Sequence, residues 1–139
     1  HEKQDYCFIS INGNSSFDKS IPHFENNKNV KVIYFDDTHE DVVKPATETF
    51  PEMIAKVFTI EQAHEIIDFL ENNKDKKTCI VHCAAGIARS GAVGTFVNDY
   101  FKVDYNEFKK QNPRIIPNAT VLMLLNRAYR ERNGGLFNA

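Results

Sequence analysis

The sequence predicts an α/β fold in which a small, mainly parallel central sheet is flanked by helices. Three apolar runs rich in β-branched residues, at 6–11, 30–35 and 78–82, are bounded by polar turns and predict strands. Apolar residues at helical spacing follow the second and third runs. Strands that alternate with helices are typical of a parallel sheet covered by helices.

Length and charge bound the organisation of the chain. Its 139 residues show no linker or repeat, so we expect one domain over 1–139. A net charge of −2 gives no bulk attraction for nucleic acid or an anionic membrane, and neither is expected as a partner. No apolar stretch approaches the roughly 18 residues that span a bilayer. We expect a monomer.

The cysteine count predicts a reducing compartment. Three cysteines, at positions 7, 79 and 83, are an odd number in a chain large enough to need no disulfide framework. We therefore expect a cytoplasmic protein with Cys7 and Cys79 in the core. The sequence begins without methionine, so its first residue need not be that of the whole protein.

The strand predictions differ in what they imply about the sheet. The run at 30–35 is apolar enough to lie inside a parallel sheet rather than at its edge. Three strands are fewer than most sheets have, so we expect at least one more short strand, within 12–29 or 42–51. The stretch 52–58 is expected to form a short helix.

Capping residues predict where the helices begin. Thr59 and Gln62 form a capping box for a helix that runs to about Glu71. Asp104 opens a second helix, with Glu107 as its capping-box partner, which must stop before residue 113, a proline. A last helix begins near Asn118 and ends at the glycines of 133–135.

The segment between residues 82 and 91 has the pattern of an anion site. An apolar strand ends at Cys83, and a helix begins near Ser90. We expect this strand to be central in the sheet. In the loop that joins it to the helix, inward backbone N–H groups and the helix dipole would favour an anion. We expect phosphate oxygens to be bound by the backbone N–H groups of five loop residues: Ala84, Ala85, Gly86, Ile87 and Ala88.

The side chains around this loop predict nucleophilic catalysis. Cys83 would attack as a thiolate stabilised by the loop N–H groups and Arg89, whose planar fork could grip two phosphate oxygens. Ser90 could hydrogen-bond the sulfur and ease its departure. His82 is expected to brace the loop through hydrogen bonds; roles in tuning the Cys83 pKa or as a general base remain open.

Four acids and a histidine, within residues 36–41, follow the second predicted strand, at the end of an open α/β sheet where ligands bind. A general acid there would protonate the leaving oxygen. We favour Asp37, which lies just beyond the strand, and keep Asp41 and Asp36 as alternatives. The histidines and cysteines show no spacing typical of metal ligands, so no metal or other cofactor is expected.

The loop resembles the signature of cysteine-dependent protein tyrosine phosphatases. The residues that carry the resemblance are His82, then Cys83 and Arg89 separated by five residues, then Ser90 and Gly91. The short chain is similar to the dual-specificity branch of that superfamily.

Two further segments extend this resemblance. Residues 37–40 are similar to the branch's general-acid stretch, and residues 110–118 to the segment before its last helix. The resemblance implies a supporting place beside the loop for Asn118, which by its own sequence position is a helix N-cap. The interval from Asp37 to Cys83 is longer than in the branch, with the surplus at 42–58.

The expected function is hydrolysis of phosphomonoesters through a phosphocysteine, with a phosphoprotein or phosphopeptide as substrate. The depth of the cleft decides the specificity: either phosphotyrosine alone is a substrate, or phosphoserine and phosphothreonine are substrates as well. Alternatives are a non-protein substrate (RNA 5′-triphosphate or phosphoinositide), a non-catalytic phosphate-binding module, and a sulfurtransferase of the rhodanese type. The loop interior contains no lysine, which argues against a highly anionic inositol phospholipid.

Overall fold

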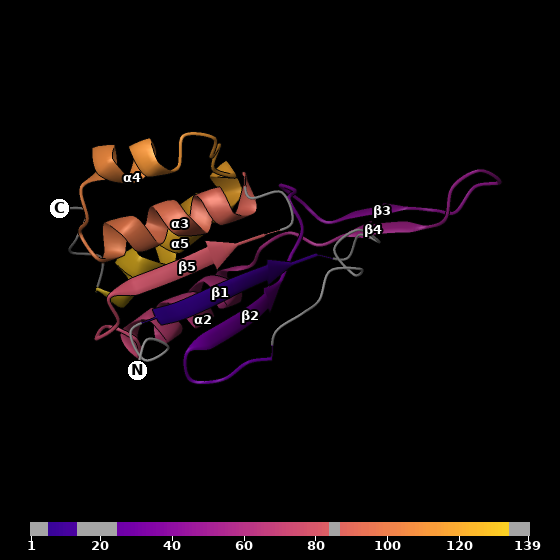
Figure 1. Ribbon diagram of the computed structural model, residues 1–139. Coiled ribbons are helices and arrows are strands. Elements are labelled where there is room, and N and C mark those ends of the chain that lie inside the picture. Colours follow the sequence, from indigo (N-terminus) through magenta and orange to yellow (C-terminus); the bar gives the residue numbers. More distant parts are fainter. Residues whose placement is uncertain (1–5, 14–24, 84–86, 134–139) are drawn as a thin grey trace.

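The computed structural model describes residues 6–13, 25–83 and 87–133 of the chain (Figure 1). The strands are β1 Tyr6–Asn12, β2 Val30–Tyr34, β3 Val42–Lys44, β4 Met53–Ala55 and β5 Thr78–His82. The helices are α2 Ile60–Glu71, α3 Arg89–Tyr100, α4 Tyr105–Gln111 and α5 Ala119–Arg132. Part of the interval 12–29, one of the two places for an additional strand, lies outside the described residues.

The main sheet is parallel and has the order β2-β1-β5. Ser10 of β1 lies opposite Val32 of β2 on one side and His82 of β5 on the other. Helices α2, α3 and α5 form a layer behind it, with α4 outside α3 (Figure 1). The predicted α/β class and parallel sheet are confirmed, and the shared strand direction brings three carboxyl ends to one edge.

Two predicted strand positions are wrong. In the described part of the chain β1 is the central strand, and both β2 and β5 lie at edges, so the loop after Cys83 leaves an edge strand. Tyr34 of β2 and Ile80 of β5 are accordingly exposed. A strand can be apolar because one of its faces is buried against the helix layer. Its apolar content therefore does not specify whether it has one neighbouring strand or two.

The core lies between one face of β1 and the helix layer. Cys7, Ile9 and Ile11 point to the same side because side chains alternate along a strand, and all three are almost completely buried. They pack against fully buried residues of the three helices, among them Ile66, Leu70, Val93, Val121 and Leu125. This packing fixes where the first turns of α3 and α5 stand relative to the sheet.

The predicted helix caps are present at the expected residues. Thr59 Oγ1 accepts from Gln62 N at 3.1 Å, and Gln62 Oε1 accepts from Thr59 N at 3.0 Å, which completes the capping box. Asn118 caps α5 through Val121 N. Asp104 caps α4, but Glu107 accepts from Gln111 instead of closing the predicted second box.

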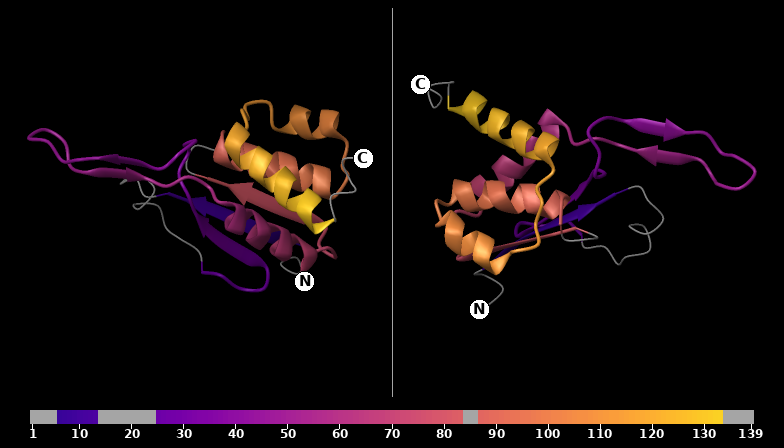
Figure 2. Two further views of the ribbon diagram at one scale, coloured as in Figure 1. Left: turned by 180° about the vertical axis from the view of Figure 1, so that it is seen from behind. Right: turned by 90° about the horizontal axis from the view of Figure 1, so that it is seen from above.

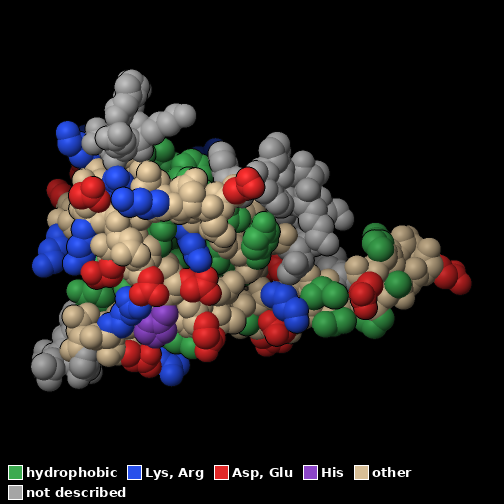
Figure 3. Space-filling view, turned by 90° about the horizontal axis from the view of Figure 1, so that it is seen from below, with side chains coloured by type: hydrophobic (Ala, Val, Ile, Leu, Met, Phe, Trp, Pro, Cys, Tyr) green, Lys and Arg blue, Asp and Glu red, His purple; other side chains and the backbone are tan. Residues whose placement is uncertain are grey.

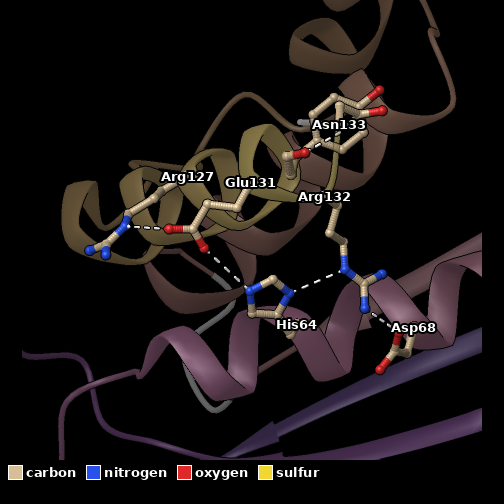
Figure 4. A network of polar contacts seen from close by, with 7 residues as sticks. His64, Asp68, Arg127, Glu131, Arg132 and Asn133 are labelled. Atoms are coloured by element: carbon tan, nitrogen blue, oxygen red, sulfur yellow. Dashed lines mark hydrogen bonds and ion pairs between the residues drawn. The ribbon is translucent and has the colours of Figure 1, made fainter. Parts of the chain in front are cut away.

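A polar network joins the outer surfaces of α2 and α5 (Figure 4). Arg132 Nε donates to His64 Nδ1 at 3.1 Å, so the imidazole proton is on Nε2, which faces Glu131 at 3.5 Å. Arg132 also pairs with Asp68, and Arg127 with Glu131. Exposed ion pairs are worth about 0–1 kcal/mol each, so the buried apolar residues determine the packing of these two helices.

Strands β3 and β4 form an antiparallel hairpin that projects from the body of the molecule (Figure 2). Val42 lies opposite Ala55, and Val43 opposite Ile54. The additional strand expected within 42–51 is thus confirmed. The predicted helix at 52–58 is wrong, because its first residues pair across the hairpin. Among the described residues, no helix combines the length and apolar character needed to cross a membrane.

Candidate active site

Residues from two sheet edges meet where the parallel strands end. Phe35 and Asp36 follow β2, and Cys83 follows β5, all at the carboxyl edge of the sheet. Phe35 N donates to Asn12 O at 2.8 Å, which continues the pairing with β1 past the last residue of β2. The predicted nucleophile and the candidate acids, far apart in the sequence, therefore leave the sheet at one side.

Cys83 lies against the first turn of α3. Its thiol donates to Ser90 Oγ at 3.3 Å, and Ser90 N donates to Cys83 Sγ at 3.4 Å. Both residues are buried. A thiolate at this position would accept from both the hydroxyl and the backbone N–H of Ser90, which favours the charged form of the sulfur.

Arg89 extends from the start of α3 towards the end of β2. Its side chain is buried, and Nη1 donates to the carbonyl oxygen of Phe35 at 3.1 Å. The contact spans 54 residues of sequence and places the guanidinium between the cysteine loop and the segment with the acids. A bond to a backbone oxygen orients the planar fork of an arginine, whose N–H donors suit the oxygens of an anion.

The phosphate-binding prediction for the loop is only partly within the described residues. Ala84, Ala85 and Gly86 lie outside them. At the end of the loop, the carbonyl of Ile87 accepts from Ile116 N, and that of Ala88 from Asn118 N, each at 3.1 Å. The segment before α5 therefore holds the last residues of the loop through its backbone.

Gly91 is a site residue whose role sequence reasoning did not identify. A Cβ atom at Gly91 would lie 3.1 Å from Ile115 Cβ and 3.6 Å from Ile116 N. A larger residue at this position would require Ile115 to move away by a few tenths of an ångström. The glycine after Ser90 thus permits a close approach between the helix start and the segment that supports the loop.

Two of the three candidate acids bind the backbone just after β4, the second strand of the hairpin. Asp36 is buried, and its Oδ2 accepts from Lys56 N at 2.7 Å. Asp41 Oδ1 accepts from Val57 N at 2.9 Å. Both carboxyl groups therefore hold the base of the hairpin in place by accepting from its backbone N–H groups.

Asp37 is exposed and contacts a different partner. Asn118 Nδ2 donates to Asp37 Oδ1 at 2.8 Å, across 81 residues of sequence. Asn118 is buried and at the same time caps α5 through Oδ1, so both ends of its amide are used. The predicted cap is confirmed, and the structure adds a contact with the favoured acid.

A second contact joins the acid loop to α5. His39 Nδ1 lies 2.6 Å from Thr120 Oγ1, in the first turn of that helix. Within the loop, Thr38 Oγ1 donates to Glu40 O at 2.8 Å. With the Asn118 bond, these contacts hold residues 37–40 against the start of α5, which in turn is bonded to the end of the cysteine loop.

His82 packs against a neighbouring strand. Its ring makes an edge contact with Phe8 of β1, with centroids 5.0 Å apart. Burial lowers the pKa of His82 below its usual value, because a charged imidazole loses hydration there. A neutral ring packed on Phe8 suits a bracing role better than that of a cation that would attract phosphate.

The described residues contain no group of three or more His, Cys, Asp or Glu side chains placed to hold a metal ion. The described residues at this edge supply a thiol, a hydroxyl, a guanidinium, a carboxyl group and backbone N–H groups. This set can bind an anion and supply both a nucleophile and an acid.

Comparisons with known proteins give distant likenesses to solved structures alone. No protein-family model and no curated protein sequence matches this chain. The crystal structure of Tk-PTP in the active form is similar to it at a TM-score of 0.48 and 18% sequence identity, covering 91% of this chain and 80% of that one. A TM-score below 0.5 carries no argument for a family, so the fold class here rests on the sheet and helices themselves.

Proposed function

We propose that this chain is a cysteine-dependent phosphomonoester hydrolase of the protein tyrosine phosphatase type, similar to the dual-specificity branch. One observation carries the proposal: Cys83 with Ser90, and Asp37 with Asn118, lie at the same sheet edge, joined through the bond from Asn118 N to Ala88 O. The pattern of Cys83 and Arg89 five residues apart provides the sequence support.

In the first step, the Cys83 thiolate attacks phosphorus and the bond from phosphorus to the leaving oxygen breaks. Asp37, in its protonated form, gives its proton to that oxygen, which a phenolate or alkoxide needs in order to leave. Arg89 and the loop N–H groups hold the three non-bridging oxygens as charge shifts among them. The product is a phosphocysteine and an alcohol or phenol.

In the second step, water attacks the phosphocysteine. Asp37, now ionised, takes a proton from the water, and the phosphorus–sulfur bond breaks. The leaving sulfur gains negative charge, and the Ser90 hydroxyl, 3.3 Å from it, can turn to donate to it. Phosphate is released, and the thiolate is restored.

The projecting hairpin supports a protein substrate carrying phosphotyrosine, phosphoserine or phosphothreonine. Its base is bonded to Asp36 and Asp41, on either side of the proposed acid. Val43, Phe50 and Ile54 are 60%, 69% and 40% exposed, an apolar surface that a small phosphate ester would not cover. Hydrophobic and acidic side chains gather on this arm in the face shown in Figure 3.

The other candidates have less support. An RNA 5′-triphosphate or a phosphoinositide would call for extra cations near the loop, and residues 84–88 include none. A non-catalytic phosphate-binding module would not need both a nucleophile and an arginine. A rhodanese-type sulfurtransferase would have no use for a carboxylate placed as Asp37 is.

Hydrolysis of an aryl phosphate tests the proposal. The full chain should release p-nitrophenol from its phosphate ester, and Cys83→Ser should abolish turnover while still binding inorganic phosphate. Cys79→Ser is a matched control, since it alters a thiol in the same strand, and it should keep wild-type turnover. Near wild-type turnover by Cys83→Ser, or an inactive wild type that binds phosphate, would reject the hydrolase assignment. Transfer of sulfur from thiosulfate would identify the rhodanese alternative.

A further inference from the structure

Cys7 and Cys79 lie side by side on neighbouring strands. They are directly opposite partners in the parallel pairing of β1 with β5. Neighbouring strands are about 4.8 Å apart, and disulfides form between Cα atoms about 4.4–6.8 Å apart. Side chains of opposite residues in a parallel pair point to the same face, so the backbone sets these two thiols at a separation that a disulfide can bridge.

The two thiols also interact chemically. A hydrogen bond with Cys79 holds the pKa of Cys7 below the usual thiol value, with the nearby Lys76 ammonium acting in the same direction. The same bond, together with burial, raises the pKa of Cys79. The shared hydrogen bond therefore favours negative charge on the Cys7 sulfur over the Cys79 sulfur.

A groove gives access to this pair. It has a volume of about 530 Å³ and lies between β5 and the helices α3 and α4. Cys7, Cys79 and Lys76 are all among its lining residues. Cys7 is buried and Cys79 partly exposed, so a small molecule in the groove would reach the thiols from the Cys79 side.

The third thiol is outside the reach of this pair. Cys83 is four residues beyond Cys79 along the chain, which at the rise of a strand is about 13 Å. Its sulfur is instead in contact with Ser90. Oxidation of Cys7 and Cys79 would therefore proceed without the proposed nucleophile, and the inference does not depend on the proposed hydrolase activity.

We propose that Cys7 and Cys79 form an oxidisable dithiol site, whose co-reactant is a hydroperoxide that enters the groove. One of the two sulfurs, as its thiolate, attacks one peroxide oxygen and the O–O bond breaks. That sulfur becomes a sulfenic acid, and the departing oxygen takes a proton from solvent and leaves as water or an alcohol. The other sulfur, as a thiol, then attacks the sulfenic sulfur, its proton goes to the departing hydroxide, and water leaves as the S–S bond forms. Two electrons pass from the two thiols to the peroxide.

Peptide mapping of the oxidised chain tests this site. The folded full-length protein is treated with hydrogen peroxide, its remaining thiols are blocked with a maleimide, and it is digested without reductant. A cross-linked peptide containing Cys7 and Cys79, with a mass loss of about 2 Da, is expected in the wild type and equally in Cys83→Ser. Cys83 should remain available to the maleimide or carry its own oxidation.

Single cysteine variants show which two cysteines form the cross-link. Cys7→Ser and Cys79→Ser should each lose the cross-link, and circular dichroism shows whether each is folded. The site is rejected if the wild-type cross-link involves Cys83. It is equally rejected if Cys7 and Cys79 stay reduced, or become sulfinic acids without a cross-link, at peroxide doses that oxidise Cys83. Both results come from the wild type, so poor folding of a variant does not affect them.

Discussion

The side-chain amide of Asn118 donates to Asp37 Oδ1 at 2.8 Å and also caps α5 through Val121 N. One buried residue thus couples the start of the last helix to the proposed general acid. Its backbone N–H donates to Ala88 O, at the end of the cysteine loop. Asn118 is in this way a positioning residue for two separate parts of the proposed site.

Asn118→Ser should separate these two roles. Serine caps helices about as well as asparagine, so the free energy of unfolding should change by well under 1 kcal/mol. The shorter side chain cannot reach Asp37, and kcat for esters with poor leaving groups should fall by up to about 100-fold. Asn118→Ala is the comparison, since it should also lose about 1 kcal/mol of stability from the cap. Equal activity of Asn118→Ser and wild type would contradict the positioning role.

Asp37→Asn should make turnover depend on the leaving group. An amide cannot give a proton, so kcat for alkyl phosphates should fall by about 10²- to 10⁴-fold, and much less for an aryl ester with a good leaving group. Steady-state rates across a series of esters check this. Asp36→Asn and Asp41→Asn should weaken the base of the hairpin without this leaving-group trend. If either shows the trend instead, the acid is misassigned.

Ser90→Ala should slow the second chemical step more than the first. Without the hydroxyl, the sulfur loses a donor at 3.3 Å as it departs from phosphorus, so the phosphocysteine should accumulate. Rapid mixing with an aryl phosphate should show a burst of phenol equal to the enzyme concentration, followed by a lower steady rate. A lower rate with no burst would place the effect in the attack step. Ser90→Thr, which keeps a hydroxyl, is the control.

Removal of the hairpin should affect protein substrates selectively. Because Val42 and Ala55 are directly paired, residues 43–54 can be replaced by the turn Asn-Gly while the Asp36 and Asp41 contacts stay intact. We expect an unchanged rate for aryl phosphate and about a 10-fold lower kcat/KM for a phosphoprotein, since burying one large apolar side chain is worth about 1.5–3 kcal/mol. The point variant Phe50→Ser should show part of this loss. Equal effects on both substrates would instead indicate a disturbed acid loop.

His82 should make the protein less stable in mild acid. Its pKa in the folded state is lowered by burial, so below the usual histidine pKa of about 6.5 the unfolded chain takes up a proton that the folded chain does not. Stability therefore falls as the pH drops from about 7 towards 5. In His82→Gln, urea midpoints at pH 5 and pH 7 should lie closer together than in the wild type. An unchanged difference between the two midpoints in His82→Gln would contradict this role of His82.

The local elements were within reach of sequence reasoning. The capping box at Thr59, the N-caps at Asp104 and Asn118, and three of the strands are encoded by residues close together in the chain. Side-chain periodicity and capping depend on neighbours within a few positions, so the amino-acid order alone determines them. The candidate nucleophile, arginine and acids likewise follow from their places at the ends of strands.

Only the tertiary structure decided which distant groups meet. Four features depend on segments that no local pattern relates. They are the edge positions of β2 and β5, the hairpin in place of a helix at 52–58, the bond from Asn118 to Asp37 and the pairing of Cys7 with Cys79. Strand order and register result from packing the whole core, because a strand's apolar pattern is satisfied by more than one set of neighbours. The sequence thus determined the chemistry available at the loop, and the packing of β1 against the helices determined which residues surround it.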